Sequence, residues 1–404
     1  MNKKFVNYHC HSSLSNTIIA DSPSTVDDYI KRLKELNHTV YVSTEHGTST
    51  GWARKYFECQ KNGIKFVYGV EAYLEDSETV YHLMLMAKNM QGMAGINDCI
   101  NYAVYNNYKY RRPRITIDTI KQFINPANVV CTTACVAGVI GRKNLVALKR
   151  LMEFFGENLW LEIGTSNTDK QKELNRTIVE INRVRPQHKI VVGLDSHYIY
   201  THERVLRDSL VESKGIRYAE DEDESEWDMD FPDYDTIVER LRTQGILSEQ
   251  QIIDSIENTN VIETFEDIKF DTSWHVPTLY PNLSIEERDK LLTKKAYERW
   301  IEFSKHVPEE LHEKYREEIG KEIKEWIKCG FSDYLLTTSE LVKRGVELGG
   351  VVTKSGRGSC SSFITTALFG LSTVDRVQAK LPLLQERFLN ADRIIESHSA
   401  PDYD

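Results

Sequence analysis

Residues 5–13 read FVNYHCHSS, and this stretch decides the fold class. The apolar segment 5–8 is typical of a short β-strand, and His9 and His11 follow it directly. In an extended backbone, residues two apart face the same side, so both imidazoles can reach one metal ion. A strand that ends in paired histidines predicts a metal site at the edge of a sheet.

Further short apolar segments follow through the first 200 residues, separated by amphipathic ones. We expect a helix that Ser22 caps and Pro23 begins, another that ends near Gly63, and others near 91–104, 145–155 and 169–184. This alternation predicts a largely parallel sheet, and the number of units favours a β/α barrel. The expected strands after the first are 39–43, 65–70, 81–87, 129–133, 159–163 and 189–193.

Residues of metal-ligand type stand at or near the ends of these strands. In a β/α barrel, functional groups gather at the C-terminal face of the strands, so such side chains can converge. Taken singly, Cys135 is more simply a buried small hydrophobe, Asp195 a turn former and His82 a core histidine. Together they favour one metal cluster, because so many coincidences are hard to obtain by accident. The candidates beside His9 and His11 are Asp21, His46, Glu71, His82, Cys135, Asp195 and His197.

Composition narrows the class of protein. A chain of 404 residues exceeds one compact core and predicts two domains, while 40% apolar and 28% charged residues exclude a disordered chain and a membrane protein. Seven scattered cysteines give no disulfide framework, and residues 1–10 hold no secretory signal, so we expect a reduced, cytoplasmic protein. The net charge of −10 argues against a general polyanion-coating protein but allows a local basic groove.

Changes in local composition give the expected domain boundaries. We predict a first domain over 1–270, a proline-containing linker over 271–283 and a second domain over 284–404. The acidic run within 218–235 is expected to be a solvated loop rather than a metal site, because charges this dense repel one another.

The first 200 residues resemble the PHP (polymerase and histidinol phosphatase) domain that begins bacterial replicative DNA polymerase III alpha subunits. The matching motifs are YHCHSS, STEHGT, YGVEAYL, YHLMLMAKN, TTACVAG and LDSHYI. The resemblance implies a distorted β/α barrel and a nine-residue ligand set for three metal ions, to which all the candidates above correspond. Glu45 departs from the family, which usually has aspartate there, but it is not one of the expected ligands.

A cluster of this kind suits phosphodiester hydrolysis. Mixed histidine, carboxylate and cysteine ligands favour zinc, manganese or iron over magnesium alone. The resemblance implies a 3′–5′ exonuclease that removes misincorporated nucleotides from the single-stranded 3′ end of a primer on DNA. Two alternatives remain: a phosphoesterase for small phosphate esters, and a scaffold whose metals only stabilise the fold.

Residues 276–404 resemble the start of the same family's palm domain, an α+β fold of nucleotidyltransferase type. The matching pieces are CGFSDYLL, KSGRGSCSSF, LLQERFLNADR and PDYD. Glycines allow a close backbone approach to phosphate, so Gly356, Arg357, Gly358 and Ser359 are expected to hold the triphosphate of a dNTP. Lys354 and Ser355 stand where the family usually has glycine and proline.

Asp402 and Asp404 correspond to the family's first two catalytic aspartates. On a strand they face one side and can share magnesium ions. The family needs a third aspartate much further on, so these 404 residues alone are not expected to polymerise DNA. The remainder of the polymerase is expected in the same natural chain or in a separate one.

A basic and aromatic segment, YKYRRPR, covers residues 108–114. Its composition suits a path for single-stranded nucleic acid, by base stacking and phosphate contact. A solvated loop explains it equally well.

Overall fold

The computed structural model describes residues 4–216, 227–273, 275, 277–353, 358–381, 383–397 and 399. They form two compact units, Met1–Phe270 and Asp271–Asp404. Among the described residues, no helix is both long and apolar enough to cross a membrane.

The first unit is built on an eight-stranded sheet. Its strands are β1 (Val40–Ser43), β2 (Lys65–Asp76), β3 (Thr79–Ala87), β4 (Tyr108–Lys109), β5 (Arg112–Ile115), β6 (Val129–Thr132), β7 (Leu159–Ile163) and β8 (Ile190–Val192). The order is β4-β5-β2-β3-β6-β7-β8, and β1 pairs with β2.

The expected parallel sheet is interrupted by β3. This strand runs antiparallel to both of its neighbours, β2 and β6, and β4 runs antiparallel to β5, whereas the other strand pairs are parallel. The prediction of a largely parallel sheet was therefore too simple, because β2 and β3 are joined by a tight turn at Ser77 and Glu78, both with positive φ.

The N-terminal segment closes the sheet into a distorted barrel. Cys10 pairs with Ser196 beyond β8, where the His11 N–H donates to the Ser196 carbonyl (2.7 Å). On its other side the Cys10 N–H donates to the Thr44 hydroxyl (2.9 Å), which lies just beyond β1. The predicted strand at 5–8 is not a regular strand, and the Val6 N–H donates to the Thr259 hydroxyl (2.9 Å) rather than to a neighbouring strand.

Alternate residues of the barrel strands fill its interior. One buried apolar cluster contains Val6 and Tyr8, Val40 and Val42, Met84 and Met86, and single residues from β2, β6, β7 and β8. Inward-facing side chains from the N-terminal segment and from β1, β2, β3, β6, β7 and β8 thus meet in one cluster, as the interior of a closed barrel requires. The mixed α/β barrel expected from the sequence is confirmed.

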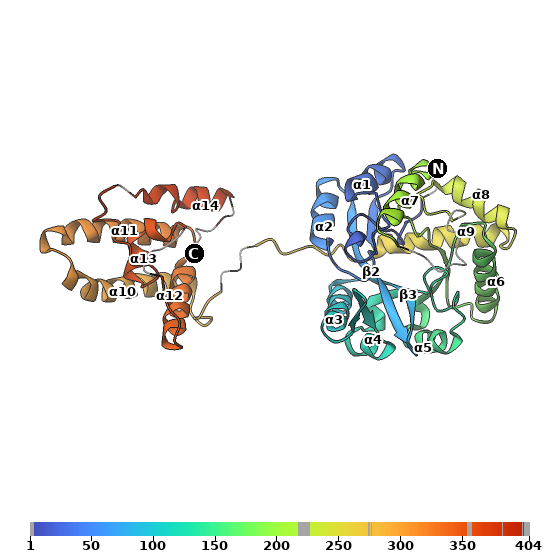
Figure 1. Cartoon of the computed structure of the whole chain (residues 1–404), viewed down its shortest axis with the longest axis horizontal. Coiled ribbons are helices and arrows are strands. Elements are labelled where there is room, and N and C mark those ends of the chain that lie inside the picture. Colours follow the sequence, from blue (N-terminus) through green and yellow to red (C-terminus); the bar gives the residue numbers. More distant parts are fainter. Residues whose placement is uncertain are drawn as a thin grey trace. The chain divides into compact units, whose positions relative to one another are not determined.

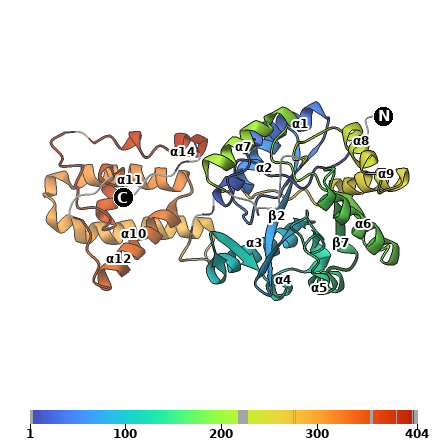
Figure 2. The same ribbon diagram turned by 45° about the vertical axis from the view of Figure 1, so that its right-hand side comes forward.

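Helices cover the outside of the barrel. Figures 1 and 2 show α1 (Val26–Glu35), α2 (Trp52–Lys61) and α7 (Arg204–Ser213) along one side of the first unit. Along the opposite side lie α3 (Met90–Asn106), α4 (Ile117–Phe123) and α5 (Leu145–Phe155). The remaining helices are α6 (Asp169–Val184), α8 (Tyr234–Gln244) and α9 (Glu249–Glu257).

The start of α1 corrects one prediction. Thr25, not Ser22, caps the helix: its hydroxyl accepts the Asp28 N–H, and the Asp28 carboxylate accepts the Thr25 N–H (2.8 Å). This reciprocal capping box satisfies two backbone donors, so a helix start at Thr25 is more stable than the expected start at Pro23. The apolar face of α1 then buries Tyr29, whose hydroxyl donates to the carbonyls of His11 (3.0 Å) and Ser196 (2.7 Å). The helix thereby fixes the junction that closes the barrel.

The second unit is helical in its described part. Its helices are α10 (Ile285–Phe303), α11 (His312–Lys328), α12 (Ser332–Glu347), α13 (Ile364–Leu368) and α14 (Ala391–Ser397). They pack around Trp326, which is fully buried and donates through its indole N–H to Thr365 Oγ1 (3.1 Å). The expected strand at PDYD lies outside the described residues.

Candidate metal centre

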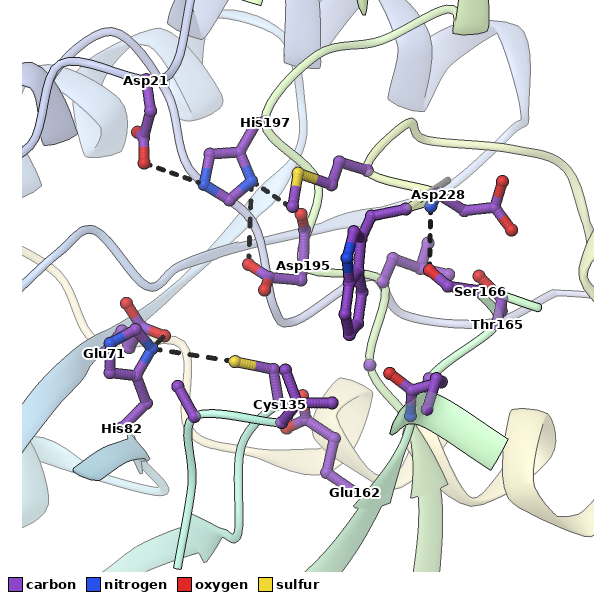
Figure 3. Close-up of a pocket in the computed structure, with 18 of the residues that line it drawn as sticks. Asp21, Glu71, His82, Cys135, Glu162, Thr165, Ser166, Asp195, His197 and Asp228 are labelled. Atoms are coloured by element: carbon purple, nitrogen blue, oxygen red, sulfur yellow. Dashed lines mark hydrogen bonds and ion pairs between the residues drawn. The ribbon is translucent and has the colours of Figure 1, made fainter. Parts of the chain in front are cut away.

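The predicted ligands converge at one end of the barrel. His9 and His11 leave the N-terminal segment, His46 follows β1, Cys135 follows β6 and Asp195 follows β8. Three sets of ligand atoms lie within 4.8 Å of one another: His11 with His46 and His197, His9 with His11 and Glu71, and Glu71 with His82 and Cys135. Figure 3 shows Asp21, His197 and Asp195 facing Glu71, His82 and Cys135 across the cavity.

Glu71 is the centre of the cluster. One of its carboxylate oxygens lies 2.6 Å from His46 Nδ1, and the other lies 2.7 Å from His82 Nδ1. The same carboxylate is 3.4 Å from His9 Nε2 and 3.8 Å from His11 Nε2. Because β2 continues to Asp76, Glu71 lies inside a long strand rather than closing it as expected, and its position is correspondingly rigid.

The antiparallel direction of β3 explains the place of His82. A residue near the start of an antiparallel strand lies at the same edge as residues near the ends of its parallel neighbours. His82 is paired with Tyr73 of β2, and its Nδ1 lies 3.7 Å from the Cys135 sulfur.

Asp195 and Asp21 complete the cluster from two loops. Asp195 Oδ1 lies 3.1 Å from His9 Nε2 and 3.2 Å from His11 Nε2, and Asp195 adopts a positive φ of 47°. Such backbone strain persists where surrounding structure imposes it, often at functional sites. Asp21 Oδ2 lies 3.3 Å from His46 Nε2 and 3.4 Å from His197 Nε2. All nine predicted ligand residues therefore meet in one cluster.

Partners behind the cluster fix which nitrogen of each histidine faces it. His9 donates from Nδ1 to Glu162 (2.5 Å), which also accepts from the Thr132 hydroxyl (2.5 Å). His197 donates from Nδ1 to the Asp195 carbonyl (2.8 Å). With Nδ1 protonated, Nε2 of both rings presents a lone pair to the cluster, as a metal ligand must.

Glu45 belongs to this outer layer. It forms a fully buried ion pair with Lys55 and accepts hydrogen bonds from the hydroxyls of Ser12 and Ser15. Sequence reasoning missed Lys55, Ser15 and Glu162, although Glu162 stands at the end of the one predicted strand for which no ligand-type residue was named.

Charge is concentrated at this site. Burial raises the pKa values of Asp21, Glu71 and Asp195, but the neighbouring imidazoles outweigh it and hold all three well below the usual range. Burial lowers the pKa of His46, yet the Asp21 and Glu71 carboxylates raise it to about 10. Burial and the neighbouring His46 lower the pKa of His11 to about 4. The three carboxylates are therefore ionised, and a cation bound between them would be stabilised.

Three buried atoms of the cluster fit a metal ion. His9 Nε2, His11 Nε2 and Glu71 Oε1 lie within 3.2 Å of Asp195 or His82 but form no hydrogen bond with the described residues. Leaving such atoms unpaired in a protein interior is costly unless a ligand meets them. Imidazole, carboxylate and thiol donors together match zinc, manganese or iron.

The cluster opens into a cavity of about 190 Å³. Arg112 and Arg142 line it together with the metal-ligand candidates, and Trp227 and Asp228 form part of a further wall. Figure 3 shows Thr165, Ser166 and Asp228 on the side of the cavity away from Glu71 and His82. Guanidinium groups beside a metal cluster give the cavity the character of a phosphate site.

The expected nucleotide-binding residues are described in part. Gly358 has a positive φ of 58° and Ser359 is buried, just before α13. Gly356, Arg357, Asp402 and Asp404 lie outside the described residues. Much of the acidic stretch, residues 217–226, lies outside them too; within its described part, Asp230 forms an ion pair with Arg240 (2.6 Å).

Comparisons with known proteins match both units. Residues 7–197 match the PHP domain, and residues 289–404 match the bacterial DNA polymerase III alpha NTPase domain. The DNA polymerase III subunit alpha of Borreliella burgdorferi is 26% identical and matches 99% of this chain and 35% of its own length. That of Aquifex aeolicus is 24% identical and matches 100% of this chain and 36% of its own.

The chain thus spans about a third of the length of these curated relatives. Among solved structures, an amidohydrolase from Chromobacterium violaceum is 15% identical, covers 48% of this chain and 88% of its own, and has a TM-score of 0.32.

Proposed function

We propose that the barrel, which matches the PHP domain over residues 7–197, hydrolyses phosphodiesters with bound metal. The similarity of the whole chain to bacterial DNA polymerase III alpha subunits supports this proposal. The substrate of this reaction is the single-stranded 3′ end of a DNA primer, which the site shortens as a 3′–5′ exonuclease. The observation that carries the proposal is the convergence of nine ligand-type residues, three of which have a buried ligand atom that forms no hydrogen bond with the described residues.

The residues divide the work between holding metal and holding substrate. His9, His11, Asp21, His46, Glu71, His82, Cys135, Asp195 and His197 would hold up to three zinc, manganese or iron ions. Metal at such a site lowers the pKa of a bound water and neutralises phosphate charge. Arg112 and Arg142 meet the non-bridging phosphate oxygens from the cavity wall, and Glu162 keeps His9 in its ligand tautomer.

The second unit contributes the start of a polymerase palm. We propose that Gly356, Arg357, Gly358 and Ser359 contact a nucleoside triphosphate, and that Asp402 and Asp404 share magnesium with a third carboxylate from the rest of the polymerase. The match of residues 289–404 to the NTPase domain of bacterial DNA polymerase III alpha supports this assignment.

A 3′-labelled single-stranded oligonucleotide, a mismatched primer and a generic phosphate monoester together test the proposal. With manganese, the chain should release single nucleotides from the two DNA substrates and leave the monoester almost untouched. His11→Ala and Asp195→Ala should each abolish the release. Turnover of the monoester alone would favour a small-molecule phosphoesterase, and bound metal without hydrolysis would favour a scaffold. Unchanged nuclease activity in both variants would refute the proposed site.

A further inference from the structure

The basic and aromatic segment folds as a β-hairpin beside the metal cavity. Tyr108 pairs with Pro113 and Lys109 with Arg112, which leaves Tyr110 and Arg111 as a two-residue turn. Both turn residues have positive φ, 52° and 64°. This is the geometry of a type I′ turn, whose preferred residues are asparagine and glycine.

Tyrosine and arginine are poor choices for such a turn. A bulky side chain at positive φ is a conformational outlier that costs free energy, and outliers of this kind gather at functional sites. Glycine at these two positions would relieve the strain, yet the chain has two large side chains there. We therefore look for a role of the Tyr110 and Arg111 side chains themselves.

The Tyr110 ring is held as a platform. It is 87% exposed, and the Arg114 guanidinium lies against it, 5.4 Å from the ring centroid. Arg114 is anchored in turn by Glu75 (2.7 Å), a carboxylate that also binds Lys109 (3.1 Å). An aromatic ring backed by an anchored cation and open to solvent is preorganised to stack on another flat group.

The hairpin leads from this platform into the metal cavity. Arg112 lines the cavity, and its guanidinium lies 5.3 Å from the centroid of the Tyr73 ring. That ring lies 5.4 Å from His82, one of the proposed ligands. Neither Arg111 nor Arg112 forms an ion pair with a carboxylate in the described part of the chain, so both charges are available to an anion.

We propose that the β4–β5 hairpin guides single-stranded nucleic acid into the cavity: Tyr110 stacks on a base, while Arg111 and Arg112 contact the phosphates between that base and the metal centre. This inference rests on the proposed function, because exonuclease activity requires a single strand whose 3′ end reaches the metal centre. Aromatic stacking with adjacent basic groups is how proteins bind single strands without reading sequence.

Binding of a fluorescein-labelled twelve-nucleotide oligothymidylate, followed by anisotropy in EDTA, tests the guide without any hydrolysis. Tyr110→Gly removes the ring and relieves the strained turn, so it does not threaten folding. We expect it to weaken binding about tenfold, the usual scale for loss of one stacked base, whereas Tyr110→Phe binds as the wild type does. Arg111→Ala should lower the slope of log affinity against log salt by about 0.7, as loss of one phosphate contact requires.

Tyr105 provides a matched control. It is 88% exposed near the end of α3, and no ring or cation packs against it among the described residues, so Tyr105→Gly should leave affinity within about twofold. Equal losses in the Tyr105 and Tyr110 variants, or an equal loss for a blunt duplex, would overturn the guide. Full affinity in Tyr110→Gly would overturn it while leaving hydrolysis in place. A Tyr110-dependent affinity in a chain that hydrolyses nothing would instead support the guide and refute the proposed exonuclease.

Discussion

A single serine hydroxyl determines how His11 can act. The Ser15 hydroxyl donates its proton to Glu45, so it must accept from its two other neighbours, the backbone N–H of His46 (3.1 Å) and the ring nitrogen Nδ1 of His11 (3.2 Å). His11 is then protonated on Nδ1 and presents the lone pair of Nε2 to the cluster. Lys55 keeps Glu45 ionised, and Glu45 in turn orients the Ser15 hydroxyl that contacts His11. The buried ion pair thereby influences the tautomer of a proposed metal ligand.

We expect Ser15→Ala to weaken metal binding, because it frees His11 to adopt the wrong tautomer. Loss of a partner behind a metal ligand costs about 10- to 100-fold in affinity. Ser12→Ala is the matched control, since the Ser12 hydroxyl also donates to Glu45 (2.5 Å) but forms no hydrogen bond with a histidine in the described part of the chain. Zinc titration of stripped protein measures the affinities, and ¹⁵N NMR of the imidazoles reports the tautomer. Equal affinities in the two variants would contradict this role.

His38 gives the fold a separate dependence on pH. It is buried against the Phe5 ring (4.7 Å between centroids), and its Nδ1 has no hydrogen-bond partner among the described residues. Burial, with Lys4 and Arg32 nearby, lowers the pKa of His38 to about 4. The unfolded chain, with a histidine pKa near 6.5, binds the proton first, so stability falls as pH drops from about 6.5 to 4.

The variant His38→Phe should remove that dependence. Between pH 6.5 and 4 the wild type should lose up to about 3 kcal/mol more unfolding free energy than the variant. Urea unfolding of both proteins across this pH range measures the difference in unfolding free energy. Titration of the metal cluster contributes equally to both proteins and cancels in that difference. Parallel curves for the two proteins would show that His38 is not responsible.

At the scale of elements, regular periodicity was enough to predict several segments. The bounds of α5, α6 and β7 agree with those expected from their apolar spacing. The direction of β3 was not predictable in this way, because strand direction depends on pairing with β2 and β6 rather than on the strand's own residues. The hairpin β4–β5 was missed since its turn lacks the usual glycine or asparagine.

The candidate site was easier to predict than the sheet that carries it. Histidine, carboxylate and cysteine side chains near the ends of strands can be recognised in the sequence as candidate metal ligands. All nine candidates meet in the structure. The residues behind the ligands could not be recognised in this way. In the sequence, Lys55 has the pattern of an exposed lysine on a helix, and only the fold shows that it is buried beside Glu45.

The cap of α1 offers a test at this scale. Thr25→Ala should destabilise the first unit by about 1 kcal/mol, the usual cost of an N-cap lost to alanine. Asp27→Ala, two residues after Thr25 and outside the capping box, should cost much less. Thermal unfolding of both variants makes the comparison. A larger loss for Asp27→Ala would place the start of the helix elsewhere.

For the whole molecule, the proposed metal site and the proposed polymerase site fall in different units. The metal cluster belongs entirely to Met1–Phe270, whereas Asp402 and Asp404 belong to the second unit by sequence. Sites in separately packed units that share no partners are expected to couple little. The double variant Asp402→Ala/Asp404→Ala should therefore keep the metal content and the proposed exonuclease activity of the wild type.

If the proposed palm assignment holds, the same double variant should abolish nucleotide addition once the remaining part of a polymerase is supplied, because the proposed two-metal site loses its bridging carboxylates. Primer extension and nuclease assays on one preparation compare the two activities. Loss of nuclease activity with metals still bound would mean that hydrolysis depends on the second unit.

The central claim, a multinuclear metal site built by the barrel, is tested most directly by counting metal ions per chain in wild-type protein and Glu71→Gln. Glu71 is the variant of choice because its carboxylate lies within 3.8 Å of four histidines. After incubation with zinc, manganese or iron(II) and removal of the excess, elemental analysis should find more than one ion in the wild type and at least one fewer in Glu71→Gln. A wild-type chain that retains none of the three metals would contradict the account.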